Sequence, residues 1–484
     1  MSPSTEISLG VIAPTTPSKA GAKKRATSAI EVRRMLGRVD LTSKVFHLPG
    51  RRPGMREAGV LCHITSLPSG KLGPDAFTFI DLLADAGITV WQVLPITPPD
   101  EHRSPYASTS AFAGWVKLCD PSFEDDPDHE LIREWLSVNA HWAWDWGLYD
   151  VLKEIHDERP WFEWPEPLRE RHPEAIEAAM QQYMPKIRGR IMNQVRFQRD
   201  WMILRHYAAQ KGVKLFGDLP IFVAKDSVDV WVHPQLFLDG VVAGVPPDYF
   251  SEEGQRWGTM LYDWSAHRDD DWTWWRMRMA RTCSLFDIVR IDHFRGFESA
   301  WAIPENEETA INGKWIDGPG DDVLQAIIDI AGDTLIVAED LGIIPESVTE
   351  LRNRHNLPGM SVLHFGFDDD NTDNPHRPEN LSKDCVVYTG THDNDTTMGW
   401  WGSATSERKL RLMEVGLAGE NACSTLIRIA MNSPSPLAIV PLQDILNLDS
   451  DARMNTPGQA AGNWKWRFDW PELVNGNWAA FKRE

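Results

Sequence analysis

The sequence predicts an α/β protein built on a (β/α)8 barrel. Eight short apolar runs recur along the chain, and segments with helical periodicity lie between several of them. The runs are continuously apolar rather than alternating, which is typical of parallel strands that are covered on both faces. Alternating strands and helices indicate a parallel sheet with right-handed crossovers, and eight such strands favour a barrel.

An open, doubly wound sheet is the alternative fold. Proteins of that kind commonly bind nucleotide phosphates through a G-x-G-x-x-G turn or a phosphate loop after the first strand. Neither pattern occurs in this sequence, so the barrel remains the preferred prediction.

The eight candidate strands share a second property: each apolar run ends in small, polar or charged residues. In chain order they are residues 59–69 (GVLCHITSLPS), 88–96 (ITVWQVLPI), 213–223 (VKLFGDLPIFV), 286–294 (FDIVRIDHF), 334–342 (TLIVAEDLG), 360–367 (MSVLHFGF), 385–393 (CVVYTGTHD) and 437–446 (LAIVPLQDIL). The functional site of a parallel barrel lies at the carboxyl ends of its strands, so these endings indicate where the chemistry occurs.

Helical segments separate several of these strands. Residues 76–87 (AFTFIDLLADAG) carry apolar side chains at helical spacing. Residues 321–332 (DDVLQAIIDIAG) end in Gly332, the residue type favoured just after a helix. Residues 345–356 (PESVTELRNRHN) begin with proline, which is favoured in the first helical turn.

Two insertions interrupt the strand–helix alternation. Residues 115–205 have helical periodicity and predict a helical subdomain packed on the barrel. Residues 229–280 are rich in Trp, Pro and Asp and predict loops. We therefore expect residues 51–484 to form one catalytic barrel that carries both insertions.

The first fifty residues differ in composition from the rest. They are rich in Ser, Thr, Ala, Pro and basic residues and lack the apolar core of a secretory signal. Such a segment is either a disordered tail or a plastid-type transit peptide. The expected location is the cytoplasm in the first case and a plastid in the second.

The composition argues against several classes of function. Lys and Arg number 49 against 70 Asp and Glu, and the net charge of −21 argues against binding to nucleic acid or to an anionic membrane. The sequence contains no apolar run of about 18 residues, the length that a membrane span requires. The five cysteines are scattered without a C-x-x-C pair, which is typical of reduced thiols in a reducing compartment.

Ionisable side chains gather at the predicted carboxyl ends of four strands. These ends carry Asp218, then Arg290, Asp292 and His293, then Glu339 and Asp340, and finally His392, Asp393 and Asp395. One Asp beside one Arg is usually a structural ion pair. Carboxylates that recur at three strand ends, as Asp292, Glu339 and Asp393 do, indicate an active site. Carboxylates that lie close together raise each other's pKa values. One of them can then stay protonated and act as an acid while another is ionised and acts as a base.

Two classes of enzyme use such a set of side chains. A glycoside-cleaving enzyme needs one carboxylate to attack a sugar carbon and another to protonate the leaving oxygen. A metal hydrolase needs Asp, Glu and His as ligands, but neither an H-x-H nor an H-E-x-x-H motif is present. The position of Arg290 beside Asp292 favours a carboxylate that a cation keeps ionised, as a nucleophile requires.

The aromatic content agrees with a sugar substrate. The chain contains 23 Trp, and the C–H faces of sugars stack on aromatic rings, although most of these rings are expected in the core. Trp257 and Tyr106 are exceptions because each lies in a polar segment without apolar periodicity.

From residue 59 onward the sequence resembles the amylomaltases, or 4-α-glucanotransferases. The resemblance rests on motifs in a fixed order: SLPS, WQVLP, SPY and SAFAG, GDLPIFVA, GVPPDYFSEEGQRWG, VRIDHFRG, VAEDLG, YTGTHDNDT, RMNTPG and GNWKWR. Thr259 and Met260 depart from the family pattern, and so do the turn after SLPS and the residues before SPY. These departures leave the preferred chain length of the substrate open.

The resemblance implies an α-amylase-type barrel, a retaining double displacement and no metal or other cofactor. It implies Asp292 as the nucleophile, Glu339 as the general acid and base, and Asp393 as the residue that stabilises the transition state. The implied sugar-binding residues are Tyr106, Asp218, Arg290, His293 and His392, with Asp248, Glu252 and Trp257 on a loop over the acceptor side.

The resemblance further implies an α-1,4-glucan donor and an acceptor that is glucose or another glucan. A covalent intermediate that is shielded from water can wait for such an acceptor. We expect a monomer or a homodimer. A glucan-binding protein without catalytic activity is the alternative from another class, and it would be expected to lack one of the three carboxylates.

Overall fold

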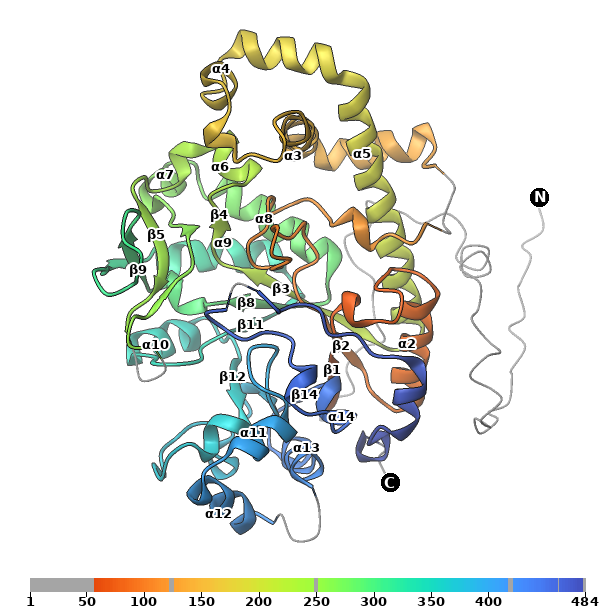
Figure 1. The fold of residues 1–484 in the computed structure, drawn as a ribbon, viewed down its shortest axis with the longest axis vertical. Helices are drawn as coiled ribbons and strands as arrows, with labels where there is room; N and C mark the ends of the chain where they lie inside the picture. Colours follow the sequence, from red (N-terminus) through yellow and green to blue (C-terminus); the bar gives the residue numbers. More distant parts are fainter. Residues whose placement is uncertain (1–55, 122–125, 248–250, 417–420, 460, 482–484) are drawn as a thin grey trace, which may run out of the picture.

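A barrel of eight parallel strands forms the centre of the molecule. The structure is a computed structural model that describes residues 56–121, 126–247, 251–416, 421–459 and 461–481. The predicted tail, residues 1–50, lies outside these ranges. The strand order β11-β8-β3-β2-β1-β14-β13-β12 places each strand beside its neighbour in the sequence (Figure 1). The predicted (β/α)8 barrel is therefore confirmed.

All eight predicted strands are present. They are β1 (Glu57–Leu61), β2 (Val90–Gln92), β3 (Lys214–Pro220), β8 (Ile288–Asp292), β11 (Leu335–Ala338), β12 (Gly359–Val362), β13 (Cys385–Tyr388) and β14 (Leu437–Pro441). The N–H of Ala338, at the end of β11, donates to the carbonyl of Pro358, just before β12, at 2.9 Å. This hydrogen bond connects the first and last strands of the sheet.

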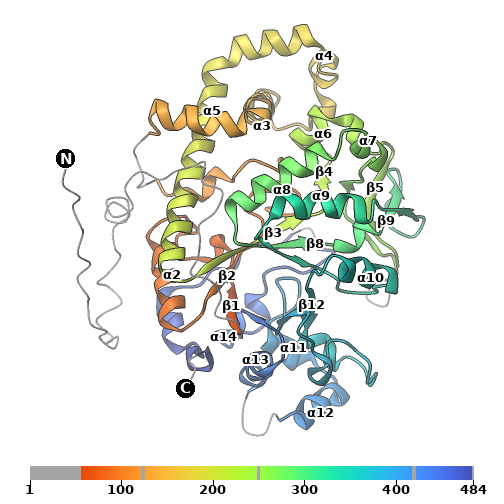
Figure 2. The same cartoon turned by 180° about the vertical axis from the view of Figure 1, so that it is seen from behind.

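Helices cover the outside of the barrel. Figure 2 shows α8 and α9 over β3 and β8, on the outer side of the barrel. The helices outside the insertion are α2 (Pro74–Asp85), α6 (Val228–Val232), α7 (Trp264–Asp269), α8 (Thr273–Leu285), α9 (Asp321–Ala331), α10 (Glu346–Arg354), α11 (Thr397–Ser403), α12 (Ser406–Glu414), α13 (Ala422–Asn432) and α14 (Leu442–Ile445). None of the helices in the described ranges combines the length and apolar character needed to span a bilayer.

The helical insertion projects from one end of the long axis of the molecule (Figure 1). It contains α3 (His129–Ile155) and α4 (Glu166–Arg169), and α5 (Pro173–Gln210) returns from it to the barrel. The two long helices cross where a Cβ on Gly147 would lie 3.0 Å from Ile187. On the barrel side, the indole N–H of Trp201 donates to the carbonyl of Leu285 at 2.8 Å, which ties α5 to the end of α8.

The structure differs from the loop prediction for residues 229–280. This stretch contains α7, α8 and the strands β5 (Val241–Val245), β6 (Gln255–Arg256) and β7 (Thr259–Met260). β5 pairs with β6 and with β9 (Ser299–Pro304), and β9 pairs with β10 (Lys314–Asp317), while β7 pairs with β4 (Val223–Ala224). Trp272, the residue before helix α8, has a φ of 58° and provides no capping side chain, so the sequence lacks a start signal for this helix.

The alternation of side chains along the strands divides the core in two. Leu61, Val90, Phe216, Ile288 and Val337 belong to one apolar cluster inside the barrel. The residues next to them in the strands pack outward against the helices, as Val60, Leu215 and Val289 do. Successive side chains of a strand point to opposite faces of the sheet. A residue two positions after a member of the inner cluster in the same strand therefore also faces the barrel interior.

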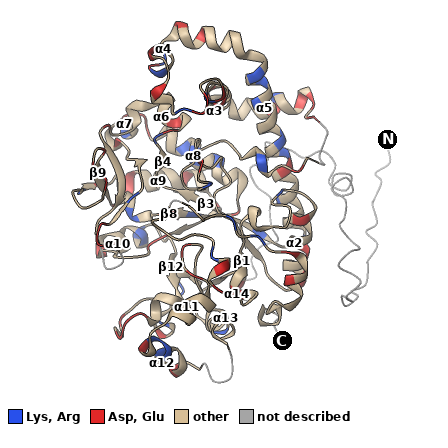
Figure 3. Ribbon diagram, in the orientation of Figure 1, with Lys and Arg blue, Asp and Glu red and all other residues tan. Residues whose placement is uncertain are grey.

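Charged side chains of both signs are interspersed over the surface helices. Figure 3 shows Lys and Arg beside Asp and Glu on α5 and on α12. Several of them form ion pairs, such as Arg190 with Asp150 at 2.5 Å between α5 and α3.

Gly217, in β3, leaves room for an aromatic ring. A Cβ at this position would lie 2.2 Å from the ring of Phe286. Gly217→Ala is expected to lower the free energy of unfolding by about 1–3 kcal/mol, because the ring would have to leave its packed position. Chemical denaturation measures the effect. Gly189→Ala is the control: no described atom lies within 4 Å of a Cβ on this exposed helical residue, and Ala favours the helix there. Equal stability of the wild type and Gly217→Ala would contradict the expected clash.

Candidate active site

The predicted side chains meet at the carboxyl ends of the barrel strands because of the strand alternation. Arg290 and Asp292 follow Ile288 by two and four residues, so both face the barrel interior. Asp218 follows Phe216 in the same way, and it lies opposite Arg290 in the register of β3 and β8. The N–H of Glu339 donates to the carbonyl of Ile291 at 3.0 Å, which places Glu339 beside the end of β8.

Arg290 bridges two carboxylates at the floor of the site. It donates from Nη1 to Asp218 Oδ2 at 2.6 Å and from Nη2 to Asp292 Oδ1 at 2.7 Å. The hydroxyl of Tyr106 donates to the same Asp218 oxygen at 2.6 Å. The side chains of Asp218 and Arg290 are 0% and 5% exposed, whereas that of Asp292 is 26% exposed. Asp292 is thus the member of this group that a substrate can reach.

The predicted contact between Arg290 and Asp292 is present, and Arg290 acts on the pKa of Asp292 in the predicted direction. Burial raises the pKa of the Asp292 carboxyl well above its usual range. Arg290 opposes this rise, while the neighbouring carboxylates Asp218, Glu339 and Asp393 add to it. Arg290 therefore favours the ionised form of Asp292 and opposes the effect of burial.

Glu339 is held by two backbone N–H groups. Its Oε2 accepts from the N–H of His293 at 2.6 Å, and its Oε1 accepts from the N–H of Leu341 at 2.9 Å. Burial raises the pKa of Glu339, and Arg290 and these N–H groups oppose the rise. Each oxygen of the Glu339 carboxyl has two lone pairs and accepts only one of these N–H groups. One of the oxygens can therefore still carry a proton.

His293 has a backbone conformation that allows this contact. Its φ of 49° lies in the left-handed region, which is uncommon for a residue other than glycine. Burial lowers the pKa of His293 to about 3, so the ring is neutral at pH 7, and its buried Nε2 has no hydrogen-bond partner among the residues that the structure describes. The ring of Trp257 meets the His293 ring edge to face at 4.7 Å and is partly exposed.

Asp393 is positioned by residues that follow the last barrel strand. Its Oδ1 accepts from Asn455 Nδ2 at 2.6 Å, and its carbonyl accepts from Arg453 Nη2 at 2.6 Å. The neighbouring His392 stacks on Tyr106 with ring centroids 5.2 Å apart and planes 8° apart. Burial lowers the pKa of His392, so its contact with Asp393 at 3.4 Å does not involve a charged imidazole at pH 7.

The structure thus brings together Asp292, Glu339, Asp393, Tyr106, Asp218, Arg290, His293, His392 and Trp257. A chain of contacts leads from Asp393 through His392, Tyr106, Asp218 and Arg290 to Asp292. Glu252 lies exposed in a turn before β6, and no hydrogen bond joins it to the other described residues of this group. Asp248 lies outside the described residues.

Three residues of the site were missing from the predicted set: Arg453, Asn455 and Trp464. Trp464 lies 5.9 Å from Tyr106 and 6.0 Å from His392, measured between ring centroids. All three occur in the motifs RMNTPG and GNWKWR, which were noted without a role. Their motif membership was the only sequence signal, because they lie beyond the last strand.

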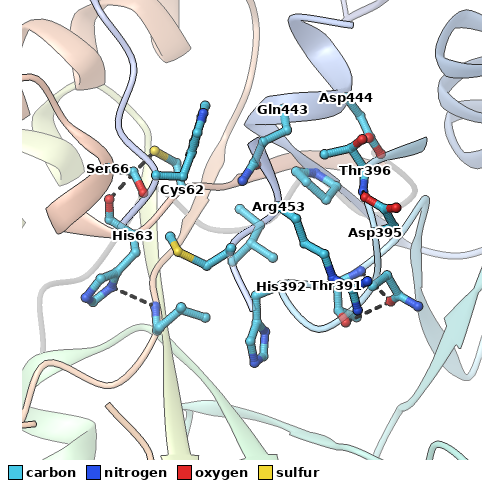
Figure 4. Close-up of a pocket in the computed structure, with 16 residues that line it drawn as sticks. Cys62, His63, Ser66, Thr391, His392, Asp395, Thr396, Gln443, Asp444 and Arg453 are labelled. Atoms are coloured by element: carbon cyan, nitrogen blue, oxygen red, sulfur yellow. Dashed lines mark hydrogen bonds between the residues drawn. The ribbon is translucent and has the colours of Figure 1, made fainter. Parts of the chain in front are cut away.

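A pocket lies at the loop that carries Asp393 (Figure 4), and Asp292, Glu339 and Asp393 are not among the residues that line it. His392 and Arg453 line it together with Thr391, Asp395, Thr396 and Asp444. Within the described residues no group of three His, Cys, Asp or Glu side chains is arranged to hold a metal ion.

Comparison with known proteins agrees with this geometry. A family model described as 4-alpha-glucanotransferase matches residues 62–128 and 115–472. A 4-alpha-glucanotransferase of Synechocystis sp. is 41% identical over 87% of this chain and 95% of its own length. A chloroplastic/amyloplastic 4-alpha-glucanotransferase of Arabidopsis thaliana is 41% identical over 85% of this chain and 81% of its own length.

A solved structure is similar over nearly the whole described fold. The amylomaltase of Streptococcus agalactiae, solved in complex with acarbose, superposes with a TM-score of 0.84 at 32% identity. The match covers 88% of this chain and 98% of that one. The chain therefore belongs to the 4-alpha-glucanotransferase family, and it is a transferase enzyme of that kind.

Proposed function

We propose that the enzyme works by a retaining double displacement through a covalent glucosyl–Asp292 intermediate. In the first step, a carboxylate oxygen of Asp292 attacks the anomeric carbon, and Glu339 protonates the departing glycosidic oxygen. In the second step, Glu339 removes the proton from the 4-hydroxyl of the acceptor, and that oxygen displaces Asp292. Each step forms one bond to the anomeric carbon and breaks another, and the proton on Glu339 is restored.

The observation that carries this proposal is the bridge made by Arg290. It orients the accessible Asp292 carboxylate at the end of β8 while its other arm is fixed on the buried Asp218. Glu339 follows the adjacent strand β11, so a second carboxyl lies next to the first. A nucleophile with a cationic neighbour beside a carboxyl with a raised pKa is the arrangement that a retaining enzyme needs.

The remaining residues would bind the sugar in the reacting position. Asp393, held by Asn455, would stabilise the positive charge that develops at the anomeric carbon. The stacked rings of Tyr106 and His392 would contact the sugar ring and its hydroxyl groups. Arg290, Asp218 and His293 would complete this pocket.

We propose α-1,4-glucans as the donor and glucose or another glucan as the acceptor. The proposal is supported by the names of the relatives and by the acarbose complex of the similar amylomaltase. Incubation with maltotriose tests it: the expected products are glucose and a ladder of longer maltodextrins. Glucose and maltose without longer products would identify a hydrolase instead and would refute the transfer step.

Trp257 is proposed to cover the acceptor side, with Asp248 and Glu252 on the same loop. Its ring packs against His293 and lies 6.5 Å from the ring of Phe222, so its removal would open the site to water. Trp257→Ala is expected to raise the ratio of hydrolysis to transfer from maltotriose about tenfold, because water would compete better for the intermediate.

The ratio of reducing ends formed to transfer products measures this effect. Trp257→Phe is the matched control, since it keeps an aromatic ring and should keep most of the transfer. An unchanged ratio in Trp257→Ala would show that this ring does not shield the intermediate.

We propose residues 51–484 as the catalytic unit and residues 1–50 as a separate segment. The Arabidopsis relative is described as chloroplastic/amyloplastic, which supports testing residues 1–50 as a targeting peptide. A fusion of these residues to a fluorescent reporter in plant cells distinguishes plastid import from a cytoplasmic tail. Light scattering after gel filtration distinguishes between the two expected states, a monomer and a homodimer.

A further inference from the structure

A buried carboxylate outside the proposed chemistry joins both ends of the loop that carries Asp393. Asp444 lies in α14, directly after β14, and is 1% exposed. Its Oδ2 accepts from the hydroxyl of Thr389 at 2.6 Å and from the hydroxyl of Thr397 at 2.8 Å, while its Oδ1 accepts from the N–H of Thr397 at 2.8 Å. Hydrogen bonds to an ionised acceptor are stronger than those between neutral groups.

The two threonines mark the ends of the loop. Thr389 follows β13 directly, and Thr397 is the first residue of α11. His392 and Asp393 lie between them, and both are residues of the proposed site. One carboxylate from a different part of the chain therefore fixes where the loop leaves the barrel and where it enters the next helix.

Contacts within the loop transmit this constraint toward Asp393. The side-chain oxygen of Asn394 accepts from the N–H and from the hydroxyl of Thr391, each at 2.8 Å. The hydroxyl of Ser450 donates to Asp395 at 2.7 Å. Figure 4 shows Asp444 next to Thr396 on one side of the pocket, with His392 and Arg453 nearer its middle. The short loop is thus braced at its ends and along its length.

A histidine completes the network behind Asp444. His364 Nε2 lies 2.9 Å from the hydroxyl oxygen of Thr397. Because the hydroxyl proton is donated to Asp444, His364 must donate from Nε2, and its Nδ1 carries no proton. Burial lowers the pKa of His364 to about 3, so the ring is neutral, and its Nδ1 has no partner among the described residues. The ring also stacks on Trp400 of α11 at 4.6 Å, which fixes its orientation.

We propose that Asp444 is a positioning residue that sets the placement of Asp393 and His392 through Thr389 and Thr397. This inference rests on the role proposed above for Asp393. Asp444 lies in the wall behind the loop and acts on the substrate only through it. A displacement of about 1 Å at a catalytic group costs on the order of 100-fold in rate, so loss of this clamp should affect turnover more than affinity.

Kinetics of three variants on maltotriose test the proposal. Asp444→Ala is expected to lower kcat about 10- to 100-fold while KM changes less than about threefold. Asp444→Asn keeps an acceptor for the Thr397 N–H and should fall between the wild type and Asp444→Ala. Thr389→Val removes one of the donors to Asp444 and should lower kcat about three- to tenfold, which is less than the effect of Asp444→Ala. This variant keeps the proposal testable if Asp444→Ala does not fold.

Asp287→Asn is the matched control for loss of a buried carboxylate. Asp287 precedes β8, at the opposite end of the barrel, where it accepts from the Leu215 N–H at 2.8 Å and pairs with Arg205 at 2.7 Å. This variant should lose stability without any change in kcat well below its unfolding temperature. An equal loss of kcat in Asp287→Asn would show that general destabilisation explains the effect of Asp444→Ala.

A double-variant experiment separates the positioning role from the proposed function. With α-maltosyl fluoride as an activated donor, Asp444→Ala should cause a much smaller loss in the Asp393→Ala background than in the wild type, because only His392 of the two groups that it positions is still present. The same loss in both backgrounds, or a change in KM alone, would overturn the positioning role. If Asp393→Ala keeps full turnover, the proposed function fails instead.

Discussion

Asp292→Asn should lower the turnover of maltotriose about 10⁴-fold or more while maltotriose binding remains measurable by calorimetry. The side chain keeps its shape and its hydrogen bond from Arg290 but loses the charge that, in the proposed mechanism, attacks the anomeric carbon. Loss of a nucleophile that acts in concert with other groups typically removes most of the catalysis. Chromatography of the maltodextrins formed over several hours can measure a turnover about 10⁴-fold below that of the wild type.

Two comparisons make this result specific. Asp287→Asn, at the other end of the same strand, should retain wild-type turnover and shows what amide substitution does to stability alone. Mass spectrometry should detect a maltosyl adduct on the peptide that contains Asp292 when the second step is slowed, because release of glucose from maltotriose leaves two glucose units on the enzyme. Turnover of Asp292→Asn near the wild-type rate would refute the nucleophile assignment and, with it, the covalent mechanism.

The barrel was predictable from sequence because its signals are local. Each strand is a short apolar run that ends in polar residues, and the covering helices show periodicity and end signals, as Gly332 does after α9. The small sheet of β5, β9 and β10 was missed because its pairing joins segments far apart in the sequence. Helix α8 was missed because its buried face carries the polar side chains Arg278, Arg281 and Thr282, which interrupt the apolar period, and because it has no capping side chain.

The site was predictable to the extent that strand ends define it. Asp292 and Glu339 lie where the alternation along β8 and β11 directs them, and these positions follow from the strands themselves. Asn455 and Arg453 could not be placed in that way, because they reach Asp393 from a segment that follows the barrel. The desolvation that raises the pKa of Asp292 is likewise a property of the packed site, whereas the neighbouring Arg290 is visible in the sequence.

Glu339→Gln should separate the two proposed steps. On maltotriose we expect a loss of turnover of about 10³- to 10⁴-fold, because no acid is present to protonate the leaving oxygen. On maltosyl fluoride the first step needs no acid, since fluoride departs as an anion. The variant should therefore release about one fluoride per enzyme molecule rapidly and then stall, because no base activates the acceptor. Asp340→Asn is the control: this neighbouring carboxylate binds the Met360 N–H and Arg352, and its removal should not produce a burst.

The pH dependence of Glu339→Gln provides an independent test of the same role. The active free enzyme needs a proton on Glu339 and none on Asp292, so kcat/KM should fall at high pH as Glu339 loses its proton and at low pH as Asp292 gains one. Burial raises the pKa of both Glu339 and Asp292, which shifts the alkaline limb and the acid limb upward from the ranges of an ordinary glutamate and aspartate. In Glu339→Gln the alkaline limb should disappear while the acid limb persists. Azide, which attacks without losing a proton, should restore turnover of maltosyl fluoride and yield an α-glycosyl azide. A persistent alkaline limb and no effect of azide would assign the proton transfer to another group.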